Sequence, residues 1–245
     1  MFDQFKHRSY KLENLDKGSY TSQEYEGCIV ELQRVNRWLG DARVLRETLL
    51  HDVATNKLKT FSVLDVGAGS GELLRVAASW ATENRTELYA VGLELNERSA
   101  IAILEQSGSA IDSVRGNALS LPFRDGQFDY VICSLFTHHF VEQQVIEILL
   151  EMSRVARRRV FIIDLHRHPI AYFLYTTVGK LFLRNRLLRE DGSLSILRSF
   201  KSDELLKLGK SAGLNNVAVT RHFPFRLALS ADARNAPTFA SQKAA

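Results

Sequence analysis

Apolar residues in the first quarter of the chain recur at steps of three and four, on both sides of a break at Gly40. The recurring positions are Ile29, Leu32, Val35 and Leu39 before the break and Val44, Leu45 and Leu49 after it. This spacing is typical of amphipathic helices. We therefore expect residues 1–60 to form an N-terminal helical cap.

Beyond residue 60 the period changes, and short apolar runs alternate with helical stretches. The runs that indicate strands span residues 61–67, 87–95, 110–117, 128–135 and 159–165, with two more in NVAVTRHFPFRLALS on either side of Pro224. Helices are expected to begin near Gly71, Glu97 and Val141. Such alternation is the signature of βαβ units. The pattern predicts an α/β fold with a Rossmann-like sheet and helices on both of its faces.

The longest apolar stretch, Ile170–Leu183, is too short to span a bilayer. It predicts a buried or interfacial helix, followed by an arginine-rich connector that ends at Asp191–Gly192. The basic residues after it keep peripheral contact with a membrane surface as an alternative. Another helix is expected over Ser202–Ala212, and Arg157–Arg159 are expected in a solvated turn. The small and polar residues 231–245 predict a disordered tail.

Amino-acid composition indicates the class of domain but does not identify a binding partner. The chain has 245 residues, 45% of them hydrophobic, which suits a single α/β domain. Its net charge of +4 arises from 32 basic and 28 acidic residues, so nucleic-acid binding is permitted but not expected. Cys28 and Cys133 match no metal-ligand spacing and favour a reducing cytoplasm. The N-terminus has no apolar core of a secretory signal, so we expect a cytoplasmic protein.

The stretch VLDVGAGSGELL, residues 63–74, predicts a strand, a tight turn and a helix start that can hold a ligand. Its glycines are Gly67, Gly69 and Gly71, and Glu72 stands where a dinucleotide fingerprint needs a third glycine. A carboxylate at that helix N-terminus would repel a pyrophosphate. The stretch therefore disfavours NAD and FAD.

Polar groups near the ends of the predicted strands describe another ligand. Asp65 can meet an ammonium group, and Glu94 lies at the distance along the chain where an acid pairs with ribose hydroxyls. In RGNALSLPF, Asn117 and the Ala118 amide can pair with the edge of adenine. Ribose, adenine and a zwitterionic amino acid without phosphate together describe S-adenosylmethionine.

Residues 61–164 resemble the class I S-adenosylmethionine-dependent methyltransferases. LDVGAGSGE resembles their first motif, GLEL their ribose-binding acid, GNALSLPF their adenine loop and FDYVICSLFTHHF their fourth strand. The family usually has Asp where this chain has Asn117. The resemblance implies S-adenosylmethionine as cofactor and a seven-stranded sheet that ends in an antiparallel hairpin. The cofactor-binding residues it implies are Asp65, Gly67, Ala68, Gly69, Gly71, Glu94, Leu95, Asn117, Ala118 and Ser134.

The resemblance also divides the chain. It places the methyltransferase domain at residues 61–230 and a helical acceptor-pocket insertion around residues 166–200. The cap and the insertion are similar, more weakly, to bacterial small-molecule methyltransferases of polyketide or quinone pathways. Tyr172, Phe173 and Tyr175 are therefore expected to line an apolar acceptor pocket.

Two histidine clusters follow the fourth and fifth predicted strands: His138 with His139, and His166 with His168. Near neutral pH a histidine can take the proton of a phenol or enol, so His138, His139 and His166 are the candidate bases. The alternatives are a helix cap or loop contact for the first pair, and contact with Asp164 for His166 and Arg167. No metal is expected, because no carboxylate cluster accompanies the histidines.

The leading hypothesis is O-methylation of a small, lipophilic phenol or enol, a reaction of secondary metabolism. C-methylation of a quinone-type acceptor is its close alternative. An RNA or protein methyltransferase is disfavoured because strand four ends in CSLF and no basic stripe is interleaved with aromatics. A non-catalytic or oxidoreductase dinucleotide-binding protein is disfavoured by Glu72.

Overall fold

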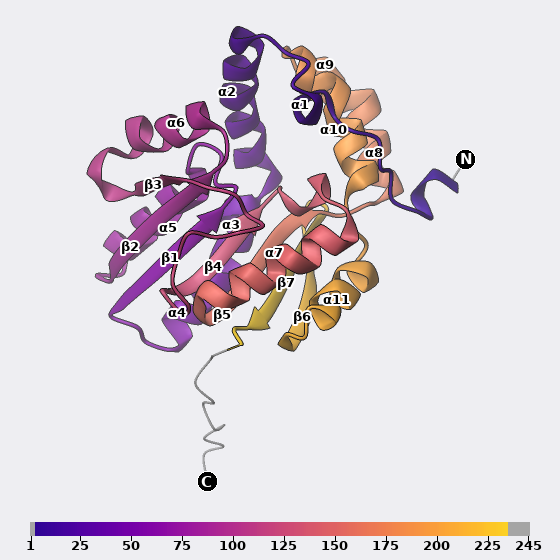
Figure 1. Ribbon diagram of the computed structural model, residues 1–245. Helices are drawn as coiled ribbons and strands as arrows, with labels where there is room; N and C mark the ends of the chain where they lie inside the picture. Colours follow the sequence, from indigo (N-terminus) through magenta and orange to yellow (C-terminus); the bar gives the residue numbers. More distant parts are fainter. Residues whose placement is uncertain (1–2, 235–245) are drawn as a thin grey trace.

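The computed structural model describes residues 3–234, which form one seven-stranded sheet flanked by helices (Figure 1). The strands are β1 Thr60–Val66, β2 Glu87–Glu94, β3 Asp112–Arg115, β4 Phe128–Ser134, β5 Ala156–Leu165, β6 Asn215–His222 and β7 Arg226–Asp232. Their order is β3-β2-β1-β4-β5-β7-β6. β1 to β5 are parallel, whereas β7 runs antiparallel to both β5 and β6. The predicted Rossmann-like sheet and its final hairpin are confirmed.

Chain connections reverse direction between β1 and β4, because β1 is followed by β2 on one side and pairs with β4 on the other. Ligands of open α/β sheets bind at such a switch point, beyond the carboxyl ends of the strands. The turn after β1 and the turn after β4 therefore flank the expected site.

Helices cover both faces of the sheet (Figure 1). One face carries α3 Asp41–Leu45, α4 His51–Thr55, α5 Glu72–Glu83 and α6 Glu97–Ser107; the other carries α7 Glu142–Val155 and α11 Ser202–Ser211. The two buried cores share the alternating side chains of β5. Val160 and Ile162 belong to one core and Phe161 and Ile163 to the other, as the two-residue period of a strand requires.

The predicted N-terminal cap is present as helices. It comprises a short 3₁₀ turn at Asp3–Phe5, α1 Asn14–Lys17, α2 Ser22–Leu39, α3, a π-helical segment at Arg46–Leu50 and α4. The break falls at Gly40, whose φ of 86° ends α2 in the left-handed region. Ile29 and Leu32 of α2 are only half-buried, so the apolar stripe of this helix faces a cavity instead of the core.

The segment between β5 and α11 differs from the sequence prediction. The expected helix is present as α8 Pro169–Leu174, a π-helical segment Tyr175–Gly179 and α9 Lys180–Phe182. The expected connector, however, is the helix α10 Arg186–Arg198. The sequence predicts a break at Gly192, but this glycine lies inside α10, where the Tyr175 ring occupies the space of a β-carbon. The glycine makes room for a neighbour and does not end a helix.

Two other predictions on chain boundaries were wrong. Arg157–Arg159 lie within β5 and not in a turn, and they form ion pairs with Asp52, Asp129 and Asp232. The predicted tail begins too early, because residues 231–232 belong to β7 and the Arg234 amide donates to Ser153 Oγ over 2.9 Å. The rest of that tail, residues 235–245, lies outside the described residues. Within residues 3–234 no helix combines the length and the apolar character needed to cross a membrane.

Candidate active site

The glycine turn after β1 adopts the backbone that its sequence predicts. Gly67, Gly69 and Gly71 have φ values of 73°, 58° and 78°, all in the left-handed region that favours glycine. A β-carbon on Gly67 would collide with the ring of Phe136, which follows β4. A β-carbon on Gly69 would meet no atom within 4 Å. The turn is therefore closed on one side by an aromatic ring and open at Gly69, where a ligand can approach the backbone.

Two acids stand beside this turn. The Asp65 side chain is buried at the end of β1, and its Oδ1 atom has no hydrogen-bond partner. Burial, reinforced by the nearby charge of Glu94, raises the Asp65 pKa from an ordinary 3.8 to about 7. Burial also raises the Glu94 pKa, although Glu94 accepts hydrogen bonds from the amides of Gly69 at 2.6 Å and Leu95 at 3.1 Å. The unpartnered Asp65 oxygen fits a ligand cation such as an ammonium group.

A cavity of about 400 Å³ connects the acids, the glycine turn and the cap. Its walls include six of the ten predicted cofactor residues: Asp65, Gly67, Ala68, Gly69, Glu94 and Ser134. The other four are not among the lining residues: Gly71, Leu95, Asn117 and Ala118. Asn117 Oδ1 accepts from the Leu119 amide over 3.0 Å, a local turn contact.

His138 and Asp164 form a buried pair at the carboxyl edge of the sheet. Their side chains are 4% and 1% exposed, and His138 Nδ1 lies 2.7 Å from Asp164 Oδ1. Burial alone would raise the Asp164 pKa, but the charge of His138 and hydrogen bonds from His138, Thr137 and the Leu165 amide lower it to about 2. The partners of Asp164 are thus Thr137, His138 and Leu165, and not the His166 and Arg167 side chains that the sequence suggested as an alternative.

His139 belongs to a second pair, which borders the cavity. Its Nδ1 lies 2.8 Å from Asp16 Oδ1, and its side chain is 24% exposed. Burial opposes ionisation of Asp16, but the hydrogen bond and charge of His139, together with Arg198, lower the Asp16 pKa to about 2. A carboxylate of this kind holds the imidazole in one orientation and stabilises its protonated form.

His166 lies apart from these pairs. Its ring is 5.4 Å from that of His168, it is not among the cavity-lining residues, and its backbone amide donates to the Phe225 carbonyl. Burial, and then the charges of His168, Arg221, Arg167 and Lys201, lower the His166 pKa to about 4. His168 instead caps α8, where its ring accepts from the Ile170 amide. Of the three candidate bases, the structure brings only His138 and His139 together.

The comparison with known proteins agrees with this geometry. Residues 64–163 match a protein family described as Methyltransferase domain. They span β1 to β5 with the glycine turn and both acids. The chain contains a class I S-adenosylmethionine-dependent methyltransferase domain.

Individual relatives of this methyltransferase are distant. Demethylmenaquinone methyltransferase of Bacillus licheniformis is 29% identical over 184 residues, which are 69% of this chain and 76% of that protein. A SAM-dependent methyltransferase from Aquifex aeolicus has a similar fold, with a TM-score of 0.54 at 16% identity, over 82% of this chain and 97% of that one. The structure of magnesium protoporphyrin IX methyltransferase from Synechocystis PCC 6803 with bound SAH has a TM-score of 0.54 at 16% identity. The match covers 79% of this chain and 83% of that one.

The acceptor end of the methyltransferase departs most from the sequence prediction. Tyr172, Phe173 and Tyr175 are not among the cavity-lining residues. Tyr172 packs edge-on against Phe5, Phe173 is exposed, and the Tyr175 hydroxyl donates to the Leu188 carbonyl. The walls come instead from the N-terminal segment, α2 and the turn after β4: Leu15, Asp16, Tyr20, Tyr25, Cys28, Ile29, Leu32, Leu135, Phe136, His139 and Phe140.

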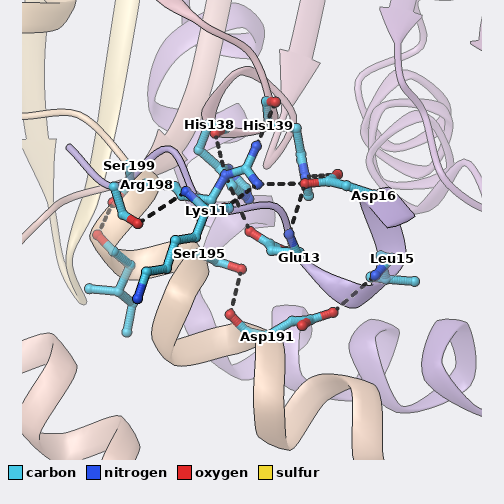
Figure 2. Close-up of polar contacts among 12 residues, drawn as sticks. Lys11, Glu13, Leu15, Asp16, His138, His139, Asp191, Ser195, Arg198 and Ser199 are labelled. Atoms are coloured by element: carbon cyan, nitrogen blue, oxygen red, sulfur yellow. Dashed lines mark hydrogen bonds and ion pairs between the residues drawn. The ribbon is translucent and has the colours of Figure 1, made fainter. Parts of the chain in front are cut away.

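Buried arginines join the N-terminal segment to the histidine turn. Arg198 of α10 donates to the carbonyls of His138 at 3.1 Å and His139 at 2.6 Å, and it also binds Asp16 (Figure 2). Arg8 donates to the His138 carbonyl at 3.2 Å. The sequence does not single out Asp16 and the two arginines, because no short-range spacing links them to histidines that lie 59 to 130 positions away.

Proposed function

We propose that this methyltransferase methylates a small lipophilic acceptor at a phenolic or enolic hydroxyl. One observation carries the proposal. The cavity that contains Asp65, the glycine turn and Glu94 also reaches the His139–Asp16 pair. The proposed donor site and a group able to accept a proton therefore share one cavity.

The donor end suits S-adenosylmethionine. In this proposal Asp65 pairs with the ammonium group, the open backbone at Gly69 approaches the ligand, and Glu94 takes the ribose hydroxyls. S-adenosylmethionine supplies a methyl group on a sulfonium, which is already activated for transfer. The protein then contributes mainly orientation and removal of the acceptor's proton.

In this proposal His139 is the base that removes the proton from the acceptor's hydroxyl. Because Asp16 occupies Nδ1, Nε2 is the ring nitrogen left to accept a proton from a hydroxyl. Asp16 stays ionised at neutral pH and keeps the imidazole in one orientation. His138, which is buried behind His139 with its ring 4.3 Å away, positions the turn through Asp164. His166 is given no part in this chemistry.

The character of the walls supports a lipophilic acceptor. Ile29 and Leu32 of α2 and the rings of Phe136 and Phe140 line the same cavity as His139. Apolar walls with a few placed polar groups are typical of small-molecule sites. C-methylation of a quinol is the second candidate, favoured by the name of the Bacillus licheniformis relative. The first step, removal of a hydroxyl proton, is common to both.

A methyl-transfer assay tests the proposal. Purified protein is incubated with methyl-labelled S-adenosylmethionine and with phenols, naphthoquinols, carboxylic acids or bulk RNA. We expect label in a phenol or naphthoquinol, with NMR of the product deciding between oxygen and carbon. His139→Ala should lower turnover about 10²- to 10⁴-fold, and His166→Ala is its matched control. Label confined to RNA, or equal rates in both variants, would refute the proposal.

A further inference from the structure

Beside the cavity, three potential ligand side chains from distant parts of the chain converge. Glu13 lies just before α1, and His138 and His139 lie in the 3₁₀ turn Thr137–His139 after β4. One carboxylate oxygen and one ring nitrogen of each histidine lie within 4.8 Å of one another. Figure 2 shows the three side chains gathered between α1 and the histidine turn.

Both histidines are oriented as metal-binding histidines usually are. A metal-binding imidazole commonly directs its second nitrogen to a carboxylate, which fixes the ring and makes the free nitrogen more basic. Here Asp164 holds Nδ1 of His138 at 2.7 Å, and Asp16 holds Nδ1 of His139 at 2.8 Å. The free nitrogen of each ring is therefore Nε2. Each of the two adjacent histidines thus has its own carboxylate partner, which is the arrangement expected of metal ligands.

Glu13 supplies the observation that is independent of the histidines. Its side chain is 2% exposed, and its Oε1 atom has no hydrogen-bond partner. The nearest cation is Arg198, with Nε at 3.8 Å, but that guanidinium already donates to the carbonyls of Lys11, His138 and His139 and to Asp16. A buried carboxylate oxygen without a donor is destabilising unless a cation or proton meets it.

The balance of charged groups around the three side chains favours a divalent cation. Four carboxylates belong to the bonded cluster, and two guanidinium groups oppose them: Glu13, Asp16, Glu142 and Asp164 against Arg8 and Arg198. With every carboxylate ionised and both histidines neutral, as metal ligation requires, the cluster carries two uncompensated negative charges.

We propose that Glu13, His138 and His139 bind a divalent metal ion of the zinc class, with its fourth position open toward the cavity. Two imidazoles and one carboxylate form a ligand set that Zn²⁺ accepts in sites with an open position. Zn–N bonds of about 2.0–2.1 Å place ligand atoms about 3.4 Å apart. Atoms that now lie within 4.8 Å of one another therefore need to approach by up to about 1.4 Å. His139, half-buried at the cavity wall, has the space to do so.

Metal titration tests the site without using catalysis. Protein treated with a chelator is titrated with ZnCl₂ by calorimetry, and with CoCl₂ while the visible spectrum of four-coordinate cobalt is followed. We expect a single ion per chain. Glu13→Gln should weaken binding at least about ten-fold, and His139→Ala should weaken it further. His166→Ala is the matched control, because it removes a histidine outside the cluster and should leave binding unchanged.

Several results would overturn the site: no heat and no cobalt spectrum, or equal binding by wild type and Glu13→Gln. Because Glu13→Gln keeps the shape of the side chain, its melting temperature is measured alongside to show that it is folded. A second readout rests on the proposed function. Nε2 of His139 cannot hold an ion and accept a proton at once, so Zn²⁺ should inhibit methyl transfer in step with occupancy. Binding without inhibition keeps the site and refutes His139 as the base.

Discussion

Asp65→Asn should make the ligand-free methyltransferase more stable and its cofactor binding weaker. The reason lies in the unpartnered, buried Oδ1 atom at the end of β1. Above neutral pH the wild-type fold must hold a desolvated negative charge next to Glu94, which no protein donor offsets. Asparagine removes the charge and keeps the shape. The same charge is what an ammonium group would pair with, so the gain in stability comes with a loss of affinity.

The size of the effect follows from the Asp65 pKa. Because that pKa rises from 3.8 in the unfolded chain to about 7 in the fold, the folded state holds the extra proton between these values. The contribution to stability is complete below pH 3.8 and is lost as the pH rises through about 7. A shift of about three units corresponds to an upper bound of about 4 kcal/mol. Asparagine leaves an unpartnered carbonyl oxygen, which costs about 1–3 kcal/mol, so we expect a net gain near 2 kcal/mol at pH 8.

Denaturation of ligand-free protein at two pH values is the assay. For a chain of this size, 2 kcal/mol corresponds to a rise in melting temperature of roughly 4–8 °C at pH 8. At pH 4.5 Asp65 is protonated in the folded wild type and its penalty falls to about 1 kcal/mol, so the variant should no longer be the more stable protein. Calorimetry should show affinity for S-adenosylmethionine lowered about ten-fold or more, the loss of one charge-assisted contact. A variant that is equally destabilised at both pH values would show that Asp65 has a partner, and the reasoning would fail.

Other substitutions probe the remaining parts of the site. His139→Ala should lower kcat about 10²- to 10⁴-fold in steady-state assays while calorimetry shows unchanged affinity for S-adenosylmethionine. Gly67→Ala, which meets the Phe136 ring at a φ of 73°, should lower the free energy of unfolding by about 2 kcal/mol or more, whereas Gly69→Ala should lower it by about 1 kcal/mol, both read from urea midpoints. Asp164, with its pKa lowered from 3.8 to about 2, contributes about 2 kcal/mol above pH 3.8 that is lost as the pH falls through 2. Asp164→Asn should therefore destabilise the protein at pH 7 and much less at pH 2.

The sheet and its donor end could be predicted because short-range rules control them. The βαβ pattern needs only the local period, and the three glycines of the turn after β1 have the left-handed backbone that their spacing suggests. Gly192 and Arg157–Arg159 misled the prediction for the converse reason. A glycine can be selected by a distant ring such as Tyr175, and arginines can lie in an exposed part of a strand when acids on neighbouring strands and helices pair with them.

The acceptor end could be predicted only in part. The histidines after β4 stand out because they follow a strand whose end must lie at the ligand edge. Their partners do not stand out, since Asp16 is a surface-like acid in a polar segment until the fold brings it to His139. The aromatic character of Tyr172, Phe173 and Tyr175 predicts that they line an apolar pocket. In the structure, however, α8 and the π-helical segment direct them toward Phe5, solvent and α10.

In the proposed site, acceptor recognition depends on the cap as much as on residues 64–163. Residues 64–163 contain the donor cradle, yet Leu15, Asp16, Ile29 and Leu32 form walls of the same cavity. Arg198 ties this segment to the histidine turn through buried hydrogen bonds. Replacing Asp16 by Ala should keep the cradle but remove the carboxylate that orients His139. Donor binding, read by calorimetry, should therefore persist in this variant while methyl transfer falls, because the two depend on different parts of the chain.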